Sequence, residues 1–451
     1  MKRLLGILLI SLFLSVACTV QTEQKPKNIV LFISDGCGFN QVDAASLYQF
    51  GETGKQVYEQ FPVKLAMSTY SLSGIGYNPD SIWSDFDYPR KKPTDSAASA
   101  TAISTGIKTF DGRIGIDTTG QALLTAVEHF EALGKATGVI TSVQFSHATP
   151  AGFVAHNISR RNYGEIAREM ILESQLDVIM GCGHPLYDND GAPLENPDYR
   201  MIGSDSLWQA LIAGSAGNDA NGDGEFDPWL LIQERSQFQE FMQGETPPRV
   251  IGIAKAKSTL QQERSGDPKA LPFELPFNPE VPTLQEMTLA AINILSKNAN
   301  GFFLMVEGGA VDWAGHSNQS GRLIEEQMSF NRAVESAVEW VNQNSNWNET
   351  IIIVTADHET GYLTGPNSGN IKNEQGDIEA VWKPLVNNGK NNLPGMQWNS
   401  GGHTNQLVPF YAKGVLAERF RDYIIQSDPV YGNYIDNSHI GQFLLSIGKK
   451  D

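Results

Sequence analysis

The chain has 451 residues, of which 41% are hydrophobic and 19% are charged, so it can bury a large core and is not disordered throughout. Acidic residues outnumber basic residues by 51 to 33, which gives a formal net charge of −18. This balance argues against binding to a nucleic-acid backbone, and it means that an anionic small substrate would need cations at its site.

The first residues have the features of an export signal. Lys2 and Arg3 precede an almost wholly apolar run over residues 4–16, which is too short to span a bilayer comfortably. We therefore expect residues 1–17 to be a signal peptide and residues 18–27 to be a polar tether.

Two processing routes fit this segment. Residues 15–17 (SVA) match the small-x-small pattern of ordinary signal peptidase, whereas residues 14–18 (LSVAC) resemble a lipoprotein box in which Cys18 would be lipidated. We favour the lipoprotein, which predicts an exported protein that is periplasmic or anchored in the outer membrane; ordinary secretion is the alternative. The other two cysteines, Cys37 and Cys182, are interpreted as buried free thiols, although an exported protein could pair them.

Short apolar runs alternate with amphipathic helical patterns along the rest of the chain. Such runs suit strands that are buried on both faces, as in parallel sheets. The alternation predicts an α/β fold, a three-layer α/β/α sandwich around a central, mostly parallel sheet. In chain order, strands are expected over residues 28–34, 137–143, 176–180, 302–306 and 351–355, and helices over residues 120–133, 163–175, 283–298 and 320–342.

Two stretches interrupt this alternation. Residues 185–280 are rich in Pro, Gly and Asp and include a helix-like pattern over residues 228–242, whereas residues 364–400 are rich in Gly and Asn. We expect both stretches to be surface insertions in a single catalytic domain over residues 28–451.

Polar side chains of the kinds that bind metals follow the expected strands. In open parallel sheets the ligand site lies beyond the carboxyl ends of the strands, and carboxylates gathered there would repel one another unless cations neutralised them. Histidine and carboxylate ligands suit zinc, and oxygen ligands suit magnesium. At strand ends these side chains are Asp35, Glu307, Asp357 and His358, and in nearby segments Asp312, His316 and His403.

Ser96 is the candidate nucleophile. It stands in the segment PTDSAASATAISTG, where an extended lead-in gives way to a run of small residues that predicts a helix. A serine at a helix N-terminus lies where backbone N–H groups favour an anion such as phosphate. The same position suits a serine that merely caps the helix, and the local sequence favours neither interpretation.

Several stretches strongly resemble the alkaline phosphatase family. They occur in the family's order and spacing from about residue 28 to the end of the chain, and the long serine motif and the E-x4-D-x3-H spacing are highly specific. The stretches are Asn28–Asp43, Thr94–Asp117 (TDSAASATAISTGIKTFDGRIGID), HATPAGFVAHNISRR, FFLMVEGGAVDWAGH, TADH and GGHTNQ.

The resemblance implies an alkaline phosphatase-like fold with two zinc ions and one magnesium ion. Ser96 would be the nucleophile that becomes phosphorylated, and Arg160 would hold the phosphate, with the adjacent Arg161 as the alternative. The ligands implied for one zinc ion are Asp312, His316 and His403, for the second zinc ion Asp35, Asp357 and His358, and for the magnesium ion Asp35, Thr149 and Glu307.

Two positions near the third metal vary within the family. One is His147, where some members carry Asp, and the other is Trp313, where others carry Lys or His. With His147 in place of Asp, negative charge around the third metal is lost, and with Trp313 in place of Lys, one water-mediated contact to the phosphate is lost. As modulators of the third site they predict weaker magnesium binding than in members with Asp and Lys. His147 is equally well interpreted as a packing histidine, and Trp313 as a wall of the pocket.

Residues 219–227 resemble a calcium loop. The oxygen-bearing side chains and a glycine occur at suitable intervals, but an EF-hand needs Glu at the twelfth position, where this chain has Leu230. A solvated acidic loop is therefore the alternative to a bound calcium ion. The candidate ligands are Asp219, Asn221, Asp223 and Asp227.

These features predict an alkaline phosphatase that hydrolyses phosphate monoesters through a phosphoserine intermediate. A metal-dependent phosphodiesterase or sulfatase of the same superfamily is the first alternative. An inactive phosphate-binding lipoprotein is the second, and the complete ligand set argues against it. The expected partners are small-molecule phosphate monoesters, a lipid anchor and, by analogy with the family, a second copy in a homodimer.

Overall fold

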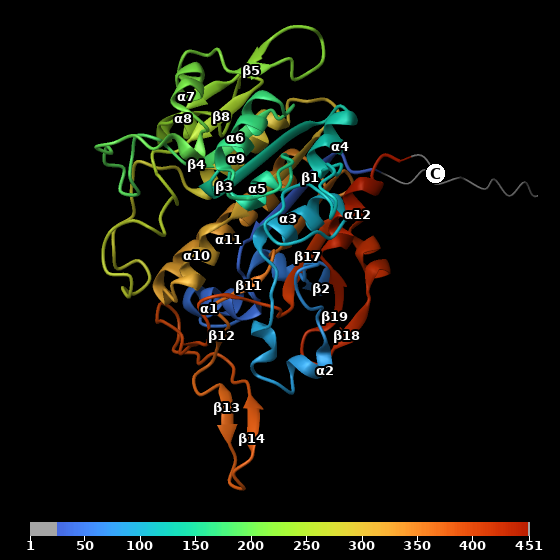
Figure 1. Ribbon diagram of the computed structural model, residues 1–451, viewed down its shortest axis with the longest axis vertical. Coiled ribbons are helices and arrows are strands. Elements are labelled where there is room, and N and C mark those ends of the chain that lie inside the picture. The colour runs from blue at the N-terminus through green and yellow to red at the C-terminus, as the bar shows by residue number, and fades with distance from the viewer. Residues whose placement is uncertain (1–24, 450–451) are drawn as a thin grey trace, which may run out of the picture.

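A sheet of eleven strands runs through the protein, and neighbouring strands in its larger part are parallel (Figure 1). The computed structural model describes residues 25–449, so the expected signal peptide and Cys18 lie outside the described residues. The strand order is β18 (Gln426–Asp428), β19 (Gly432–Asp436), β2 (Val63–Ser68), β17 (Val408–Gly414), β10 (Thr350–Thr355), β1 (Asn28–Ser34), β9 (Phe302–Gly308), β3 (Ala136–Gln144), β4 (Val178–Cys182), β8 (Val250–Ile253) and β7 (Leu230–Ile232).

The four strands at the middle of this sheet are buried along their whole lengths, as continuous apolar runs predict. These strands are β10, β1, β9 and β3, and they run parallel to one another. Strand β17 is antiparallel to both β10 and β2, so the sheet is mixed at one side. The expected α/β class with a mostly parallel central sheet is confirmed.

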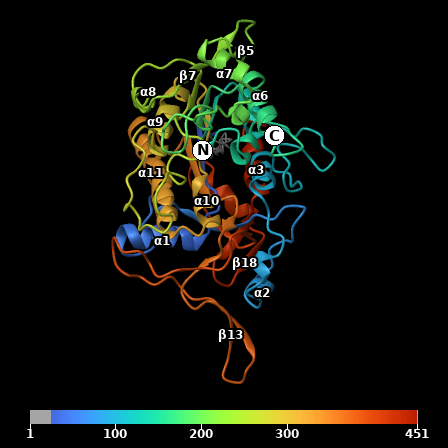
Figure 2. The same cartoon turned by 60° about the vertical axis from the view of Figure 1, so that its left-hand side comes forward.

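Helices cover the sheet in two layers (Figure 2). One layer contains α1 (Phe39–Phe50), α8 (Arg235–Glu240), α9 (Leu284–Leu295), α10 (Ala310–His316) and α11 (Ser320–Asn344). The other contains α3 (Ser96–Thr105), α4 (Ala126–Ala132), α5 (Ala148–Ala151) and α12 (Ser438–Ser446). The remaining helices are α2 (Pro79–Ile82), α6 (Tyr163–Leu172) and α7 (Asp205–Ile212). Within residues 25–449 no helix has the length and apolar character needed to cross a bilayer.

The largest difference in helix boundaries concerns α4, which begins at Ala126 rather than at residue 120. Thr125 caps this helix: its hydroxyl accepts a hydrogen bond from the Glu128 N–H, and the Glu128 carboxylate accepts one from the Thr125 N–H. This capping box fixes the helix start, so the preceding residues stay outside the helix.

The sequence predicts that the segment 185–280 is a surface insertion, but part of it belongs to the central sheet. Its strands β7 and β8 pair in parallel with each other, and β8 pairs with β4, so they extend the central sheet. The prediction of a helix over residues 228–242 is also partly wrong, because this stretch contains the strand β7 and only a short helix, α8. Strands of three or four residues are too short for a hydrophobic period to distinguish them from helix.

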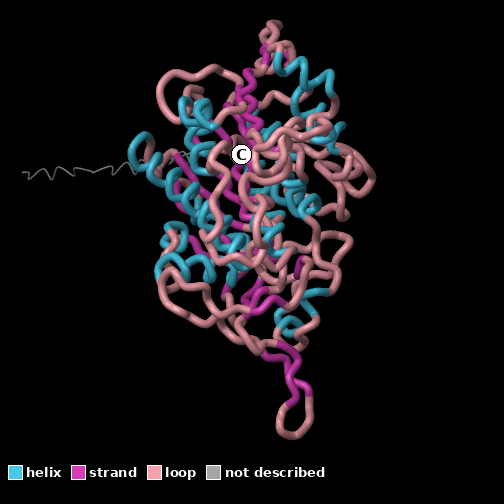
Figure 3. The backbone as a smooth tube through the Cα atoms, turned by 90° about the vertical axis from the view of Figure 1, so that its left-hand side faces the viewer, coloured by secondary structure: helices cyan, strands magenta, loops and turns pink. Residues whose placement is uncertain are grey.

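The segment 364–400 contains a hairpin that projects from the body of the protein (Figures 1 and 3). Its strands β13 (Gly369–Lys372) and β14 (Ile378–Val381) pair with each other and not with the central sheet. Further two-stranded pairs are β5 (Gly217–Asn218) with β6 (Asp227–Pro228), β11 (Glu359–Thr360) with β16 (His403–Thr404), and β12 (Leu363–Thr364) with β15 (Gln397–Trp398).

Cys37 and Cys182 are buried free thiols, as expected. Burial raises the pKa of the Cys37 thiol to about 12, so this side chain stays protonated at neutral pH.

Candidate active site

The loop after β1 brings Asp35 against helix α10. Gly36 adopts a left-handed conformation with φ of 74°, and a Cβ atom there would lie 2.6 Å from the Asp312 Cα. Only glycine permits this approach. The glycine of the ISDGCG motif therefore places two of the predicted ligand carboxylates side by side.

Asp35, Asp357 and His358 form one group of potential metal ligands, with the ligand atoms all within 4.8 Å of one another. His358 Nε2 lies 3.1 Å from Asp357 Oδ2 and 3.5 Å from Asp35 Oδ1. All three side chains are fully buried. Asp357 Oδ1 accepts hydrogen bonds from the N–H groups of Gly36 and His358, which leaves Oδ2 directed to the group. This is the set of ligands predicted for the second zinc ion.

Asp312, His316 and His403, predicted for the other zinc ion, also lie together. The two Nε2 atoms are 3.1 Å apart, and Asp312 oxygens lie 3.4 Å from His316 Nε2 and 3.5 Å from His403 Nε2. Each Nδ1 lies beside a backbone carbonyl, that of Gly401 for His316 and that of Thr94 for His403. If the proton of each imidazole is on Nδ1, the Nδ1–H group donates a hydrogen bond to that carbonyl and Nε2 is free to bind a metal.

His403 reaches this position on β16, where it pairs with Thr360 of β11. Asp312, His358 and His403 also satisfy the distance criterion for a metal group. The two groups of ligands are therefore adjoining parts of one cluster.

A third group contains Asp35, Glu307 and His147. Glu307 is on β9, in register with Ile33 of β1 and Thr141 of β3, and the Thr141 hydroxyl donates a hydrogen bond to Glu307 Oε2. His147 stands where the sequence predicts a modulator of the third site, and its imidazole is close enough to be a ligand there.

Several buried oxygen atoms of these groups make no hydrogen bond within the described part of the chain. An unpaired polar atom in the interior is costly, so the orphaned oxygens fit a site built for cations. These atoms are Asp35 Oδ1 and Oδ2, Asp357 Oδ2, Glu307 Oε1 and Thr149 Oγ1.

The pKa values of the buried carboxyl groups and of His358 also indicate a site for cations. Burial and the charge of Asp357 raise the pKa of Asp35 well above its ordinary range. Burial raises the pKa of Asp357 to about 8 and that of Glu307 to about 7. Burial also lowers the pKa of His358, which keeps its imidazole neutral and able to bind a metal. A cation among these carboxyl groups would reverse the cost of ionising them.

Ser96 begins helix α3, and Asp95 caps it: the Asp95 carboxylate accepts a hydrogen bond from the Ala98 N–H. The interpretation of Ser96 as the capping serine is therefore wrong. Its hydroxyl lies 3.2 Å from His358 Nε2, next to the ligand cluster.

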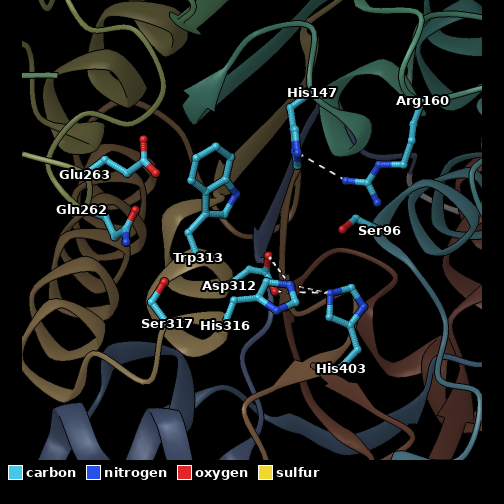
Figure 4. A pocket seen from close by; sticks show the side chains of 10 residues that line it. All are labelled: Ser96, His147, Arg160, Gln262, Glu263, Asp312, Trp313, His316, Ser317 and His403. Atoms are coloured by element: carbon cyan, nitrogen blue, oxygen red, sulfur yellow. Dashed lines mark hydrogen bonds and ion pairs between the residues drawn. The ribbon is translucent and has the colours of Figure 1, made fainter. Parts of the chain in front are cut away.

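Arg160 lies on the other side of Ser96 (Figure 4). Its guanidinium Nη1 donates a hydrogen bond to Asp95 Oδ2 at 3.0 Å, and its Nη2 lies 3.3 Å from His147 Nε2. Burial and the charge of Arg160 lower the pKa of His147 to about 3. Arg161, the alternative phosphate ligand, is exposed and does not line the pocket.

A cavity of about 530 Å³ opens over this assembly. It is lined by Ser96, His147, Arg160, Gln262, Glu263, Asp312, Trp313, His316, Ser317 and His403 (Figure 4). Trp313 forms part of the wall, and its indole lies edge-to-face with the His147 imidazole, 5.9 Å between ring centroids. The sequence does not predict Gln262 or Glu263 at the site, since they come from the segment expected to be an insertion.

The predicted calcium loop lies elsewhere and is exposed. Its aspartates do not form a group of metal ligands of the kind found at the cavity, within the residues that the structure describes. Asp219 and Asp227 instead accept hydrogen bonds from backbone N–H groups of the loop itself. Calcium binding here stays a prediction.

Comparisons with known proteins find relatives that belong to one family. A family model described as alkaline phosphatase matches residues 26–378. Alkaline phosphatase 3 of Bacillus subtilis is 28% identical and covers 88% of this chain and 86% of its own length. The alkaline phosphatase of Escherichia coli is 30% identical over 75% of this chain and 71% of its own length.

Solved structures share the fold. A mutant of TAB5 alkaline phosphatase with magnesium bound in its M3 site superimposes with a TM-score of 0.64 at 25% identity, covering 95% of this chain and 99% of its own. The cold-active alkaline phosphatase of a psychrophilic Shewanella species superimposes with a TM-score of 0.66 at 24% identity, covering 94% of this chain and 100% of its own. On its sequence and its fold, this chain belongs to the alkaline phosphatase family.

Proposed function

We propose that this protein hydrolyses phosphate monoesters to an alcohol and inorganic phosphate through a phosphoserine intermediate on Ser96. One observation carries the proposal: the Ser96 hydroxyl lies between the ligand cluster, at His358, and the guanidinium of Arg160, in a single cavity. A nucleophile, a phosphate-binding cation and a set of metal ligands thus converge on one point.

The residues of the chain have distinct parts in this reaction. Ser96 Oγ attacks phosphorus as the bond from phosphorus to the ester oxygen breaks, and the alcohol leaves with a proton. Water then attacks the phosphoserine, releases phosphate and restores the serine. Arg160 can hold two phosphate oxygens with its planar fork, and Asp95 fixes the orientation of that fork. Such positioning supplies much of the catalysis in phosphoryl transfer.

The proposal includes two zinc ions and one magnesium ion at the ligand groups. We assign one zinc ion to Asp312, His316 and His403, the other to Asp35, Asp357 and His358, and the magnesium ion to Asp35, Thr149 and Glu307. When bound, such ions lower the pKa of an attached hydroxyl or water and neutralise charge on the phosphoryl group. The orphaned oxygens of Asp35, Glu307 and Asp357 support this assignment.

The setting in which the protein works is also part of the proposal. The N-terminal sequence supports export, with a lipid anchor on Cys18 or ordinary signal cleavage. A homodimer is proposed by analogy with the family.

The decisive experiment compares hydrolysis of a chromogenic phosphate monoester with that of the matching diester and sulfate. Wild type and Ser96→Ala would each be assayed with zinc and magnesium and again after chelation. We expect monoester turnover that requires both the metals and Ser96, and a phosphate label that is trapped on Ser96 by acid quench. Dominant diester or sulfate turnover would overturn the substrate class, and tight phosphate binding without turnover would favour a binding protein.

A further inference from the structure

The cavity has opposite charges at its two ends. Arg160 lies beside Ser96 at one end, and Glu263 lies at the other, with the indole of Trp313 between them (Figure 4). Glu263 is the one carboxylate among the lining residues that belongs to none of the metal-ligand groups.

Nothing in the described part of the chain neutralises this carboxylate. Glu263 forms no ion pair with a described cation, and its side chain accepts one hydrogen bond, from the neutral Asn189 amide at 3.0 Å. Its side chain is exposed to the solvent of the cavity mouth. Beside it, Gln262 is buried, and its Oε1 has no hydrogen-bond partner among the described residues.

This wall is held firmly in place. The Glu263 N–H donates to Thr259 Oγ1 at 2.8 Å, and Gln262 Nε2 donates to Gln319 Oε1 at 2.9 Å. The next residue, Arg264, is buried and donates to Glu325 Oε2 of α11 at 2.9 Å. The backbone that carries the acidic group is therefore fixed at the end of the cavity and is not part of a loose surface loop.

We propose that Gln262, Glu263 and Trp313 form the subsite for the leaving alcohol, and that it selects phosphate monoesters whose alcohol carries an ammonium group. The inference rests on the proposed function, because it places the phosphate between Ser96 and Arg160. The alcohol then extends past Trp313 towards Glu263. A cation there gains from the carboxylate, whereas an anionic alcohol is repelled.

Three substrates of similar size test the charge preference. They are the monophosphates of 6-aminohexan-1-ol, hexane-1,6-diol and 6-hydroxyhexanoic acid, whose alcohols are cationic, neutral and anionic and whose chains are long enough to extend past Trp313. Their intrinsic reactivities differ, so the informative quantity is the ratio of kcat/KM values, compared between wild type and Glu263→Gln. Intrinsic differences cancel in that comparison. Glu245→Gln removes an exposed charge that does not line the cavity and is the matched control.

We expect Glu263→Gln to lower the ratio of cationic to neutral substrate by about threefold, the size typical of an exposed charge pair. Glu263→Lys should lower it by about tenfold and raise the ratio of anionic to neutral substrate. High salt should weaken both effects, and Glu245→Gln should leave the ratios unchanged.

Ratios that do not respond to either Glu263 substitution, while all three substrates are hydrolysed, would overturn the subsite and leave the proposed function intact. A response shared equally by all three substrates would also overturn it, because it would show a role for Glu263 in the fold or the chemical step. If none of the substrates is turned over by wild type, the proposed function fails first.

Discussion

Asp95 holds the guanidinium of Arg160, with the Arg160 Nη1 at 3.0 Å from the Asp95 Oδ2. The same carboxylate caps helix α3 through its Oδ1, which accepts a hydrogen bond from the Ala98 N–H. One side chain thus orients the group proposed to bind phosphate and fixes the helix that carries the proposed nucleophile.

Two substitutions of Asp95 separate these roles. Asp95→Ser keeps a capping hydroxyl but loses the contacts of Oδ2 with Arg160 and with the Gly112 N–H, whereas Asp95→Ala loses all three contacts. We expect both variants to weaken inhibition by inorganic phosphate several-fold, because Arg160 is no longer held in place. Asp95→Ala should be less stable than Asp95→Ser by about 1 kcal/mol, the contribution of the cap, measured by urea unfolding. Unchanged phosphate inhibition in both variants would show that Arg160 does not need Asp95.

A second prediction concerns magnesium at the third site. His147 stands beside Asp35 and Glu307 where a carboxylate would add negative charge. We therefore expect His147→Asp to bind magnesium more tightly than wild type, by roughly tenfold or more, when the metal is titrated calorimetrically into zinc-loaded protein. His147→Asn, similar in size to Asp but uncharged, is the control and should not show the gain. Equal affinity in all three proteins would contradict the prediction.

Stability should depend strongly on the buried ion pair between Arg264 and Glu325. Both side chains are 3% exposed, and Arg264 also donates to the backbone carbonyls of Pro276 and Gln261. Arg264→Met removes the nearer of two cations from a buried carboxylate and leaves Arg322, whose Nη1 lies 3.7 Å from Glu325 Oε2. We therefore expect a loss of about 3 kcal/mol in urea unfolding, at the lower end of the range for a broken buried pair.

Two controls accompany this substitution. Arg168→Met breaks an exposed pair with Glu173 and should cost about 0.5 kcal/mol or less. Adding Glu325→Leu to Arg264→Met should not recover the lost stability, because it takes the carboxylate away from the buried Arg322. A cost for Arg264→Met as small as that for Arg168→Met would show that the buried pair is not needed.

The contribution of His156 to stability should depend on pH. Burial alone would lower its pKa, but hydrogen bonds to Glu169 and to the Leu123 carbonyl raise the pKa above its ordinary value. A raised histidine pKa means that its stabilisation is fully present below the ordinary pKa and is lost as pH rises through the folded value. The destabilisation caused by His156→Gln should therefore be larger at pH 5.5 than at pH 9.

His129 provides a control of opposite sign. Burial lowers its pKa, and its Nε2 lies 2.7 Å from the Ile447 carbonyl. The destabilisation caused by His129→Gln should accordingly be larger at pH 9 than at pH 5.5. Urea unfolding of both variants at the two pH values decides the matter: a pH-independent cost for His156→Gln would exclude a charged contact with Glu169.

Much of the central architecture can be predicted from the sequence, because its strands are buried on both faces and leave long apolar runs. Strand β1 has the predicted bounds, and α11 differs from its prediction by two residues. The predicted ligands also come together, since Asp35, Glu307 and Asp357 lie at the same edge of a parallel sheet.

Other features of the structure have no local pattern in the sequence from which they could be predicted. The short edge strands β7 and β8 are specified by pairing with β4, which is distant in sequence. The position of Glu263 at the cavity depends on contacts with Asn189 and on the buried pair of its neighbour Arg264. Each is a tertiary contact, which a hydrophobic period or a short motif does not encode.

His403 enters the site through a two-residue ladder between β11 and β16, late in the chain. A nascent polypeptide that stops before this residue already contains Ser96, Arg160 and all the other candidate ligands. It nevertheless lacks one side of the metal cluster. The proposed phosphatase activity should therefore arise only near the end of biosynthesis, once the chain has passed His403.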